Sequence, residues 1–204
     1  MFKHYAKIID LEPDRLMALT DGIFAIAITL LILNLEIPET AQFTSYLALN
    51  HFLINLIPQI ITYAASFIIL STFWIYHHVY LRVKYIDILF LWFNIIWLIF
   101  IVLMPFTTSL ISVSSQFFAA DLIFGGTVLI SVLLFLGIFH YAWDNNMLEE
   151  SIKKSKKAVY RSLSMMIIIT ILASILGYIF NGWGVLLYLL LPIYSIIKIS
   201  NAKN

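Results

Sequence analysis

The composition of this chain is that of a membrane protein. Its 204 residues are 62% apolar and 11% charged, whereas soluble domains carry about 25% charged residues. The net charge of +1 gives no general attraction to nucleic acid, so no nucleic-acid partner is expected. The absence of cysteine excludes disulfides, thiolate metal sites and cysteine nucleophiles. The first residues show no short apolar core with a small-residue cleavage site, so no cleaved signal peptide is expected.

Six apolar stretches are long enough to cross a bilayer as helices, because about 20 apolar residues span the hydrocarbon core. In chain order, the sequence predicts these helices at 16–35, 47–78, 86–110, 118–143, 158–179 and 183–200. The second stretch is unusually long, and Pro58 is expected to kink this helix or to mark its true start. The fold class expected is therefore an all-α membrane protein, with six transmembrane helices forming one domain over residues 1–204.

The basic residues predict how these helices are oriented. All twelve lysines and arginines fall on one side of the membrane if both termini and the loops near 82–84 and 144–157 lie there. The positive-inside rule then places both termini in the cytoplasm of a multi-pass protein of the cell membrane. The loop at 144–157 is expected mainly to set this topology, and the alternative is that its lysines bind anionic lipid heads.

The first stretch carries the most informative pattern. An aliphatic stripe recurs there at intervals of three and four residues, at Ile23, Ile26, Leu30, Leu33 and Ile37. A second face holds small residues, which let helices approach closely and indicate a central helix: Ala18, Gly22, Ala25 and Thr29. The residues alone allow the stripe to fill a core, face lipid or line a dry pore, and the core interpretation is the ordinary one. A pore would require symmetric assembly of several copies, because one chain shows no polar pathway.

Polar residues are expected to gather at the cytoplasmic end of the first two helices. Asp21 lies about 9 Å inward of Arg15 at about 1.5 Å per residue, and the second helix returns to this level at Trp74, His77 and His78. An ionisable residue inside a membrane helix needs a partner. The sequence predicts a hydrogen-bonded cluster that joins the two helices at Asp21, with His77 preferred to His78 as the partner.

Other partners and roles for Asp21 remain open at this stage. Arg15 and Thr20 are alternative donors. A structural clamp is the favoured role, with a proton relay through Asp21 and His77 as one alternative. Zinc ligation by Asp21, His77 and His78 is another, although adjacent histidines on a helix point about 100° apart and rarely bind one ion.

Two segments resemble a known family. Arg15-Leu-Met-Ala-Leu-Thr-Asp21, with the apolar helix that follows it, is similar to the Arg-x-x-x-Phe-Ser-Asp signature and first helix of the transmembrane protein 175 family. Trp74-Ile-Tyr-His77-His78 is similar to the pattern in that family's second helix. The family comprises endolysosomal potassium channels and their prokaryotic relatives. Leu19 and Thr20 replace the signature Phe and Ser, so the packing at position 19 departs from the family pattern.

The resemblance implies a homotetramer in the membrane lipid, with the first helices lining a central pore that has no carbonyl filter. It implies no cofactor and no bound metal, with K⁺ and other monovalent cations as permeant partners. The implied pore constriction comprises Ile26, Leu30 and Leu33, and Thr29 is implied as a possible selectivity residue. The implied structural network beside the pore helix comprises Arg15, Thr20, Asp21, Trp74 and His77. Glu36 and Glu39 follow the first helix and are expected to attract cations at the outer mouth.

The expected function is a potassium-preferring cation channel with a hydrophobic constriction, and not an enzyme. The alternative is a proton-coupled secondary transporter that uses Asp21 and His77. A membrane scaffold without transport is the third class.

Overall fold

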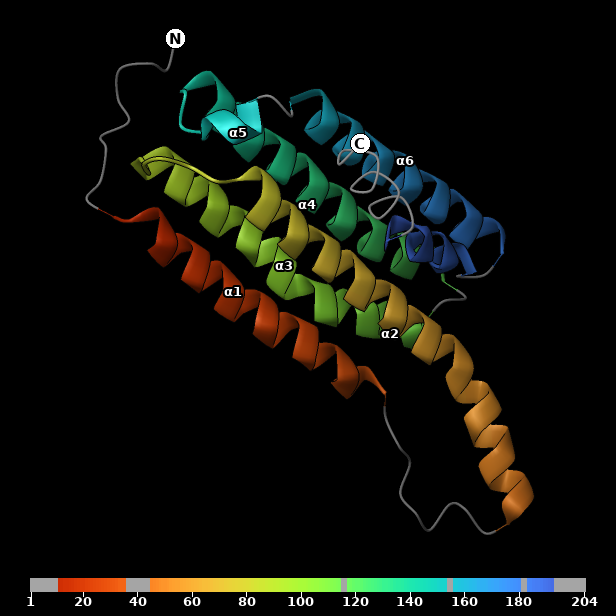
Figure 1. Ribbon diagram of the computed structural model, residues 1–204. Coiled ribbons are helices and arrows are strands. Elements are labelled where there is room, and N and C mark those ends of the chain that lie inside the picture. Colours follow the sequence, from red (N-terminus) through yellow and green to blue (C-terminus); the bar gives the residue numbers. More distant parts are fainter. Residues whose placement is uncertain (1–10, 36–44, 115–116, 154–155, 181–182, 193–204) are drawn as a thin grey trace, which may run out of the picture.

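The structure is a computed structural model that describes residues 11–35, 45–114, 117–153, 156–180 and 183–192 (Figure 1). This part of the chain is all-helical apart from its connections. Its elements are α1 (Pro13–Leu30), the 3₁₀ helix η1 (Leu31–Asn34), α2 (Tyr46–Tyr80), α3 (Ile88–Ser114), α4 (Phe118–Asp144), α5 (Glu150–Lys153), α6 (Lys156–Ile179) and the 3₁₀ helix η3 (Trp183–Leu190).

Five helical segments are long and apolar enough to cross a membrane, namely α1 with η1, α2, α3, α4 and α6. They correspond to the first five predicted spans. The sixth predicted span, 183–200, begins with η3 and continues past the described residues, so it stays a prediction. The alternative that Pro58 marks the start of the second helix is wrong, because α2 begins at Tyr46. α2 instead bends where its N-terminal part leaves the bundle (Figure 1).

Trp97 of α3 joins four helices at the centre of the bundle. Its ring is fully buried and contacts Phe24 of α1, with 5.6 Å between ring centroids, and Phe135 of α4, at 5.4 Å. Phe73 of α2 meets it edge-on at 6.0 Å. The indole Nε1 donates a hydrogen bond to the carbonyl oxygen of Ser131 at 3.1 Å, which satisfies its only polar atom. The core is therefore organised around α3.

Small residues bring α4, α6 and η3 together. A Cβ at Gly184 would collide with the backbone carbonyl of Ala173, so only glycine lets η3 lie against α6. Gly177 of α6 similarly leaves room for the carboxylate of Asp121, which is buried in the first turns of α4. These close approaches are typical of membrane helices, where packing replaces the hydrophobic effect as the driving force between helices.

The connections at one end of the bundle are tied together. An isolated antiparallel bridge pairs Val83, between α2 and α3, with Leu148, between α4 and α5. The backbone N–H of Lys84 donates to the carbonyl of Met147 at 2.8 Å. The two loops therefore lie at the same end of the bundle, as their predicted placement on one side of the membrane requires. Basic residues of the described chain occupy this end, at Arg15, Arg82, Lys84, Lys153, Lys156, Lys157 and Arg161.

Candidate pore helix and its polar contacts

α1 buries one face against the rest of the subunit. Pro13 begins the helix, where its missing N–H costs no hydrogen bond. The buried side chains follow a helical period and end with the first residue of η1: Leu16, Thr20, Phe24, Ala27 and Leu31. This face packs mainly against α2 and α3, and Phe24 reaches the central Trp97 ring.

The aliphatic stripe lies on the opposite, exposed face of the subunit. Ile26 is 61% exposed, Leu30 41% and Leu33 69%, whereas Ile23 is half-buried at the edge of the face. The small residues Ala18, Gly22, Ala25 and Thr29 are exposed as well. The interpretation that the stripe fills the core is therefore wrong for the single subunit at positions 26, 30 and 33. Ile37 lies outside the described residues.

The change from α1 to η1 aligns two residues of the stripe. η1 is a 3₁₀ helix that begins directly after Leu30. Side chains three residues apart eclipse one another in a 3₁₀ helix. Leu33 therefore stands nearly above Leu30, instead of being rotated away from it by the α-helical drift.

Thr29 bonds its own helix. Its hydroxyl lies 2.8 Å from the carbonyl oxygen of Ala25 and 2.9 Å from that of Ile26. A threonine hydroxyl has one proton to donate and retains lone pairs for a further donor or a cation.

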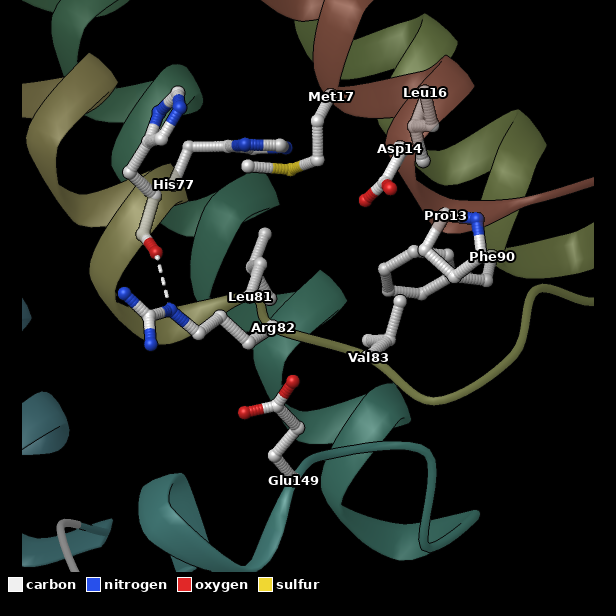
Figure 2. Close-up of a pocket in the computed structure, with 11 residues that line it drawn as sticks. Pro13, Asp14, Leu16, Met17, His77, Leu81, Arg82, Val83, Phe90 and Glu149 are labelled. Carbon is white, nitrogen blue, oxygen red and sulfur yellow. Dashed lines mark hydrogen bonds between the residues drawn. The ribbon is translucent and has the colours of Figure 1, made fainter.

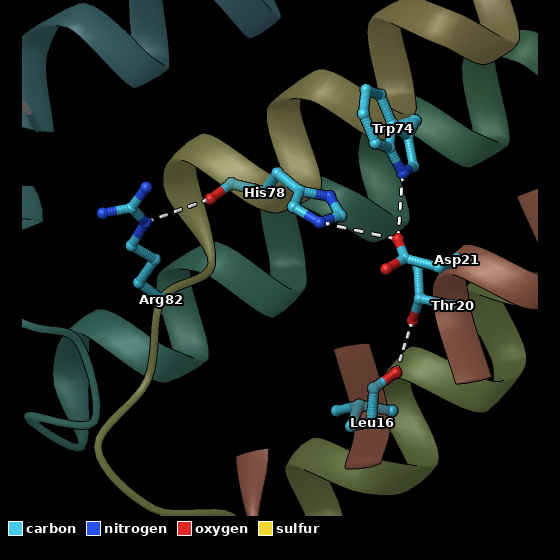
Figure 3. A network of polar contacts seen from close by, with 6 residues as sticks. All are labelled: Leu16, Thr20, Asp21, Trp74, His78 and Arg82. Atoms are coloured by element: carbon cyan, nitrogen blue, oxygen red, sulfur yellow. Dashed lines mark hydrogen bonds and ion pairs between the residues drawn. The ribbon is translucent and has the colours of Figure 1, made fainter. Parts of the chain in front are cut away.

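Asp21 joins α1 to α2 (Figure 3). Its Oδ1 accepts a hydrogen bond from the indole Nε1 of Trp74 at 2.9 Å, and Nε2 of His78 lies 3.5 Å from the same oxygen. The carboxyl side chain is 47% exposed and that of His78 is 35% exposed, so this contact lies at the edge of the subunit. The predicted link between the two helices at Asp21 is present, and Trp74 takes part in it.

The preference for His77 over His78 as the partner of Asp21 is wrong. His77 is 1% exposed and its Nε2 lies 3.3 Å from Oδ1 of Asn94 on α3. Its ring also stacks on Trp97, at 5.4 Å between centroids and 7° between planes. Position 78 is four residues after Trp74 and so shares its face of α2, whereas position 77 points toward α3. This spacing was the signal in the sequence that identifies the correct histidine.

The other predicted members of the network are not brought to Asp21 within the described residues. Thr20 is buried and donates its hydroxyl to the carbonyl of Leu16 at 2.9 Å. Arg15 is exposed and forms no ion pair with Asp21 there. Glu36 and Glu39 lie outside the described residues.

Asn34 makes a contact with α3 that the sequence did not predict. Its Nδ2 donates to the carbonyl of Pro105 on α3 at 3.2 Å, which fixes the far end of η1. The available signal was a lone amide that ends a long apolar run. α1 with η1 is thus held near one end by Asp21 and at the other by Asn34.

No metal site appears in the part of the chain that the structure describes. There, no group of three His, Asp or Glu side chains is placed to hold an ion. Asp21 and His78 face each other, but His77 is turned into the core, so the three side chains of the zinc alternative do not converge.

Sequence comparison relates this chain to named potassium channels. The family model described as endosomal/lysosomal potassium channel TMEM175 matches residues 15–105, which include Asp21, Trp74 and His78. A protein named a potassium channel from Chamaesiphon minutus is 29% identical over 135 residues, covering 64% of this chain and 66% of that protein. Another from a Chryseobacterium species is 33% identical over 105 residues, covering 51% of each. The chain thus spans only 51% to 66% of the length of these curated relatives.

The fold is similar to solved structures. A crystal structure of a lysosomal potassium-selective channel TMEM175 homolog from Chamaesiphon minutus matches with a TM-score of 0.75 and 25% identity, covering 91% of this chain and 96% of that one. A variant of the potassium channel MtTMEM175, in complex with a nanobody fusion, shares the fold with a TM-score of 0.56 at 17% identity. The signature segment, the relatives and the structural match show that this multi-pass membrane protein is similar to TMEM175 proteins, over residues 15–105 in sequence and over most of the chain in fold; the TMEM175 family is one of potassium channels and not of enzymes.

Proposed function

We propose that the protein is a potassium-preferring cation channel, built as a homotetramer with the α1 helices around a central axis. The exposed face of α1 carries this proposal. It combines the aliphatic stripe with the small residues around Gly22, and the subunit covers neither. Small residues in a membrane helix serve close helix packing. A face that lacks packing partners within the subunit is therefore well suited to meet further copies of the same helix.

The constriction is assigned to Ile26, Leu30 and Leu33. Positions 26 and 33 lie about 10 Å apart along the axis, at about 1.5 Å per residue. Rings of aliphatic side chains offer an ion no ligands, so a narrow pore closes by dewetting. The eclipsed Leu30 and Leu33 would make this dry segment continuous. K⁺ gives up its hydration more readily than Na⁺, so a moderate preference for K⁺ is expected from such a barrier.

Oxygen atoms near the constriction are expected to adjust this preference. Thr29 is exposed one residue before Leu30, and its hydroxyl oxygen retains lone pairs beside the pore. Glu36 and Glu39 are proposed to concentrate cations at the outer mouth, with their field screened over about 8 Å at physiological salt. These carboxylates would also repel anions.

Contacts on the buried face of α1 support its role as a pore-lining helix that is held in place but can move slightly. Asp21 is bonded to α2, Asn34 is bonded to α3, and Phe24 packs on Trp97 between them. A modest outward movement of α1 would widen a closed aliphatic ring enough to wet it. We assign the structural network around the pore helix to Asp21, Trp74 and His78, with Arg15 at its cytoplasmic edge.

The proton-coupled transporter is less well supported. That alternative passes protons between Asp21 and His77, but His77 bonds Asn94 and stacks on Trp97 in the core. Protons would need a path from Asp21 through the half-buried His78 instead. The proposed location is the cell membrane, with both termini in the cytoplasm by the positive-inside rule.

Reconstitution into liposomes tests the three functional classes together. A channel gives potassium flux that follows the potassium gradient, is larger for K⁺ than for Na⁺ and does not need a proton gradient. Saturable flux that depends on a proton gradient would instead establish a carrier. The absence of any flux from well-folded oligomers would indicate a scaffold.

A further inference from the structure

The first sixteen residues of α2 form an arm that leaves the bundle. None of these residues, 46–61, is buried, whereas α2 buries nine residues between Thr62 and His77. In Figure 1 the arm bends away from the other helices and extends beyond η1. The remainder of α2, residues 62–80, is about 29 Å long at about 1.5 Å per residue, which already matches a hydrocarbon core of about 30 Å. The arm is therefore additional to the length that a membrane span requires.

Polar residues of the arm continue the face of α2 that packs into the bundle. His51, Asn55 and Gln59 recur every four residues, and Thr62 and Ser66 follow at intervals of three and four. Residues at these intervals share one face of a helix. Thr62 and Ser66 are both buried in the subunit. The bundle-facing side of α2 thus carries one polar stripe, which runs from His51 to Ser66.

The two ends of the polar stripe differ in their partners. Where the subunit covers the stripe, the hydroxyl of Ser66 is hydrogen-bonded to that of Thr108 on α3 at 2.9 Å. On the arm, His51 and Asn55 are exposed and Gln59 is half-buried. These three side chains form no hydrogen bond or ion pair within the described residues.

The opposite end of α2 is held by its own subunit. His77 meets Asn94 of α3 at 3.3 Å, and Nε of Arg82 donates to the carbonyl oxygen of His78 at 3.4 Å (Figure 2). The cavity of about 330 Å³ in Figure 2 also lies at this end, so it cannot receive side chains of the arm. The described part of the subunit therefore offers the polar side chains of the arm no partner.

Neither lipid nor water suits the arm on all sides. Leu53, Ile54 and Ile57 are large, apolar and exposed, so water would leave them uncovered. The amides of Asn55 and Gln59 would lack hydrogen-bond partners in hydrocarbon, and such side chains in membrane helices bond across to other helices. An amide carries both donors and an acceptor, so it can bond either kind of group on a protein surface.

We propose that the arm packs against the adjacent subunit of the tetramer, with His51, Asn55 and Gln59 turned toward it. This inference rests on the proposed function, because it requires several copies around α1. The connection to α1 favours a second copy as the occupant. Only nine residues separate Leu35 from Ser45, and this link spans at most about 36 Å. The arm is therefore kept near the exposed face of α1, where the copies are proposed to meet.

Photo-crosslinking of the full-length protein in membranes tests this contact. The photoreactive residue p-benzoylphenylalanine replaces Asn55 on the polar stripe, Leu53 about 160° around the same helix, or Ile26 on α1. Both arm positions are exposed, so they differ mainly in the face that they occupy. Covalent dimers of the chain on denaturing gels are expected for positions 26 and 55 and not for position 53.

The crosslinking outcomes separate the arm contact from the proposed pore. Dimers at position 26 without dimers at position 55 would overturn the arm contact and leave the tetramer around α1 in place. Dimers at positions 53 and 55 in equal yield would overturn the assignment of the polar face. The absence of dimers at all three positions would contradict the proposed function as well.

Leucine variants test whether the amides hold the arm. Asn55→Leu and Gln59→Leu are each expected to weaken a subunit contact about threefold, the value of an average hydrogen bond between membrane helices. Asn50→Leu is the matched control, because it removes an exposed amide of the same arm that lies outside the polar stripe. Dissociation on dilution in detergent, followed by the mass of the complex, measures the difference. The proposal is overturned if Asn55→Leu and Gln59→Leu dissociate no more readily than Asn50→Leu.

Discussion

At the scale of single residues, Asp21 shows how a carboxylate is kept beside a membrane helix. It lies at the edge of the subunit, where the side chain is 47% exposed and Trp74 and His78 supply donors. The indole bond fixes one oxygen of the carboxylate, and the ring of His78 lies against that indole at 4.7 Å between centroids. The three side chains therefore form one unit across α1 and α2.

Asp21→Asn is expected to weaken the contact between α1 and α2 by about 1 kcal/mol. A hydrogen bond to a charged group contributes about 1.5–3 kcal/mol when sheltered, and the exposure of Asp21 reduces this. Thermal unfolding of the purified oligomer measures the change. Asp144→Asn is the control, because Asp144 also faces a histidine, His140, at 3.3 Å but is more exposed and distant from α1. If neither oligomer stability nor ion flux changes in Asp21→Asn, the contact has no role.

Trp97→Ala is expected to destabilise the subunit strongly. Loss of a fully buried Trp or Phe side chain costs about 3–5 kcal/mol, and here the cavity would separate α1, α2 and α4 from α3. Trp97→Phe keeps most of the volume but loses the hydrogen bond to Ser131 and the contacts of the second ring, so the stability that it loses should be smaller than for Trp97→Ala. Unfolding temperatures of the two variants provide the comparison. Equal, small shifts would mean that Trp97 does not organise the core.

The sequence predicted that Asp21 contacts the second helix, but it did not identify the correct histidine partner. A carboxylate in an apolar helix needs a donor, and that requirement is local and general. The choice between two adjacent histidines depends on which face of α2 meets α1, and this is a property of packing. Asn94 and Trp97 draw His77 into the core, and neither residue signals this role through its own neighbours in sequence.

At the scale of elements, α1 is a helix with two different faces. Large residues such as Leu16 and Phe24 pack into the subunit, and the opposite face alternates small and aliphatic residues. The periodicity that defines these faces was readable from the sequence. The transition to η1 after Leu30 was not, because 3₁₀ geometry here depends on how Leu31 and Asn34 are held against the bundle.

Gly22→Leu is expected to disrupt the proposed tetramer while sparing the fold of the single chain. A Cβ at Gly22 meets no atom within 4 Å in the subunit, and leucine favours a helix over glycine by about 1 kcal/mol. In the proposed tetramer, a larger side chain would nevertheless separate the α1 helices that pack closely around the axis. The mass of the detergent-solubilised complex reports the effect.

Gly137→Leu on α4 is the matched control for this variant, since a Cβ there is equally free of contacts in the subunit. It should leave the oligomer intact. An unchanged oligomer for Gly22→Leu as well would argue that this face of α1 meets lipid.

At the scale of the whole molecule, the helices do not have equal lengths. α1 with η1 has 22 residues and α2 has 35. At about 1.5 Å per residue these lengths correspond to about 33 Å and about 52 Å, against a hydrocarbon core of about 30 Å. None of the first residues of α2, from 46 to 61, is buried in the subunit. Hydropathy located this helix but could not tell which part belongs to the bundle, because apolar residues serve both lipid contact and packing.

The grouping of the basic loops was predictable, whereas their direct link was not. The positive-inside rule depends only on counting charges along the chain, and it put the loops at 82–84 and 144–157 together. The bridge between Val83 and Leu148 joins them through backbone atoms, which carry no sequence signal.

The central claim is that side chains on the exposed face of α1 form the barrier to ions. Potassium and sodium efflux from liposomes should be measured for the unchanged protein, for Leu30→Asn and for the control Ile171→Asn, which places the same amide on an exposed position of α6. The account predicts faster potassium efflux and a smaller preference over sodium for Leu30→Asn alone, because an amide wets the constriction. Efflux that is indifferent to Leu30→Asn, and equally to polar substitution of Ile26 and Leu33, would contradict it.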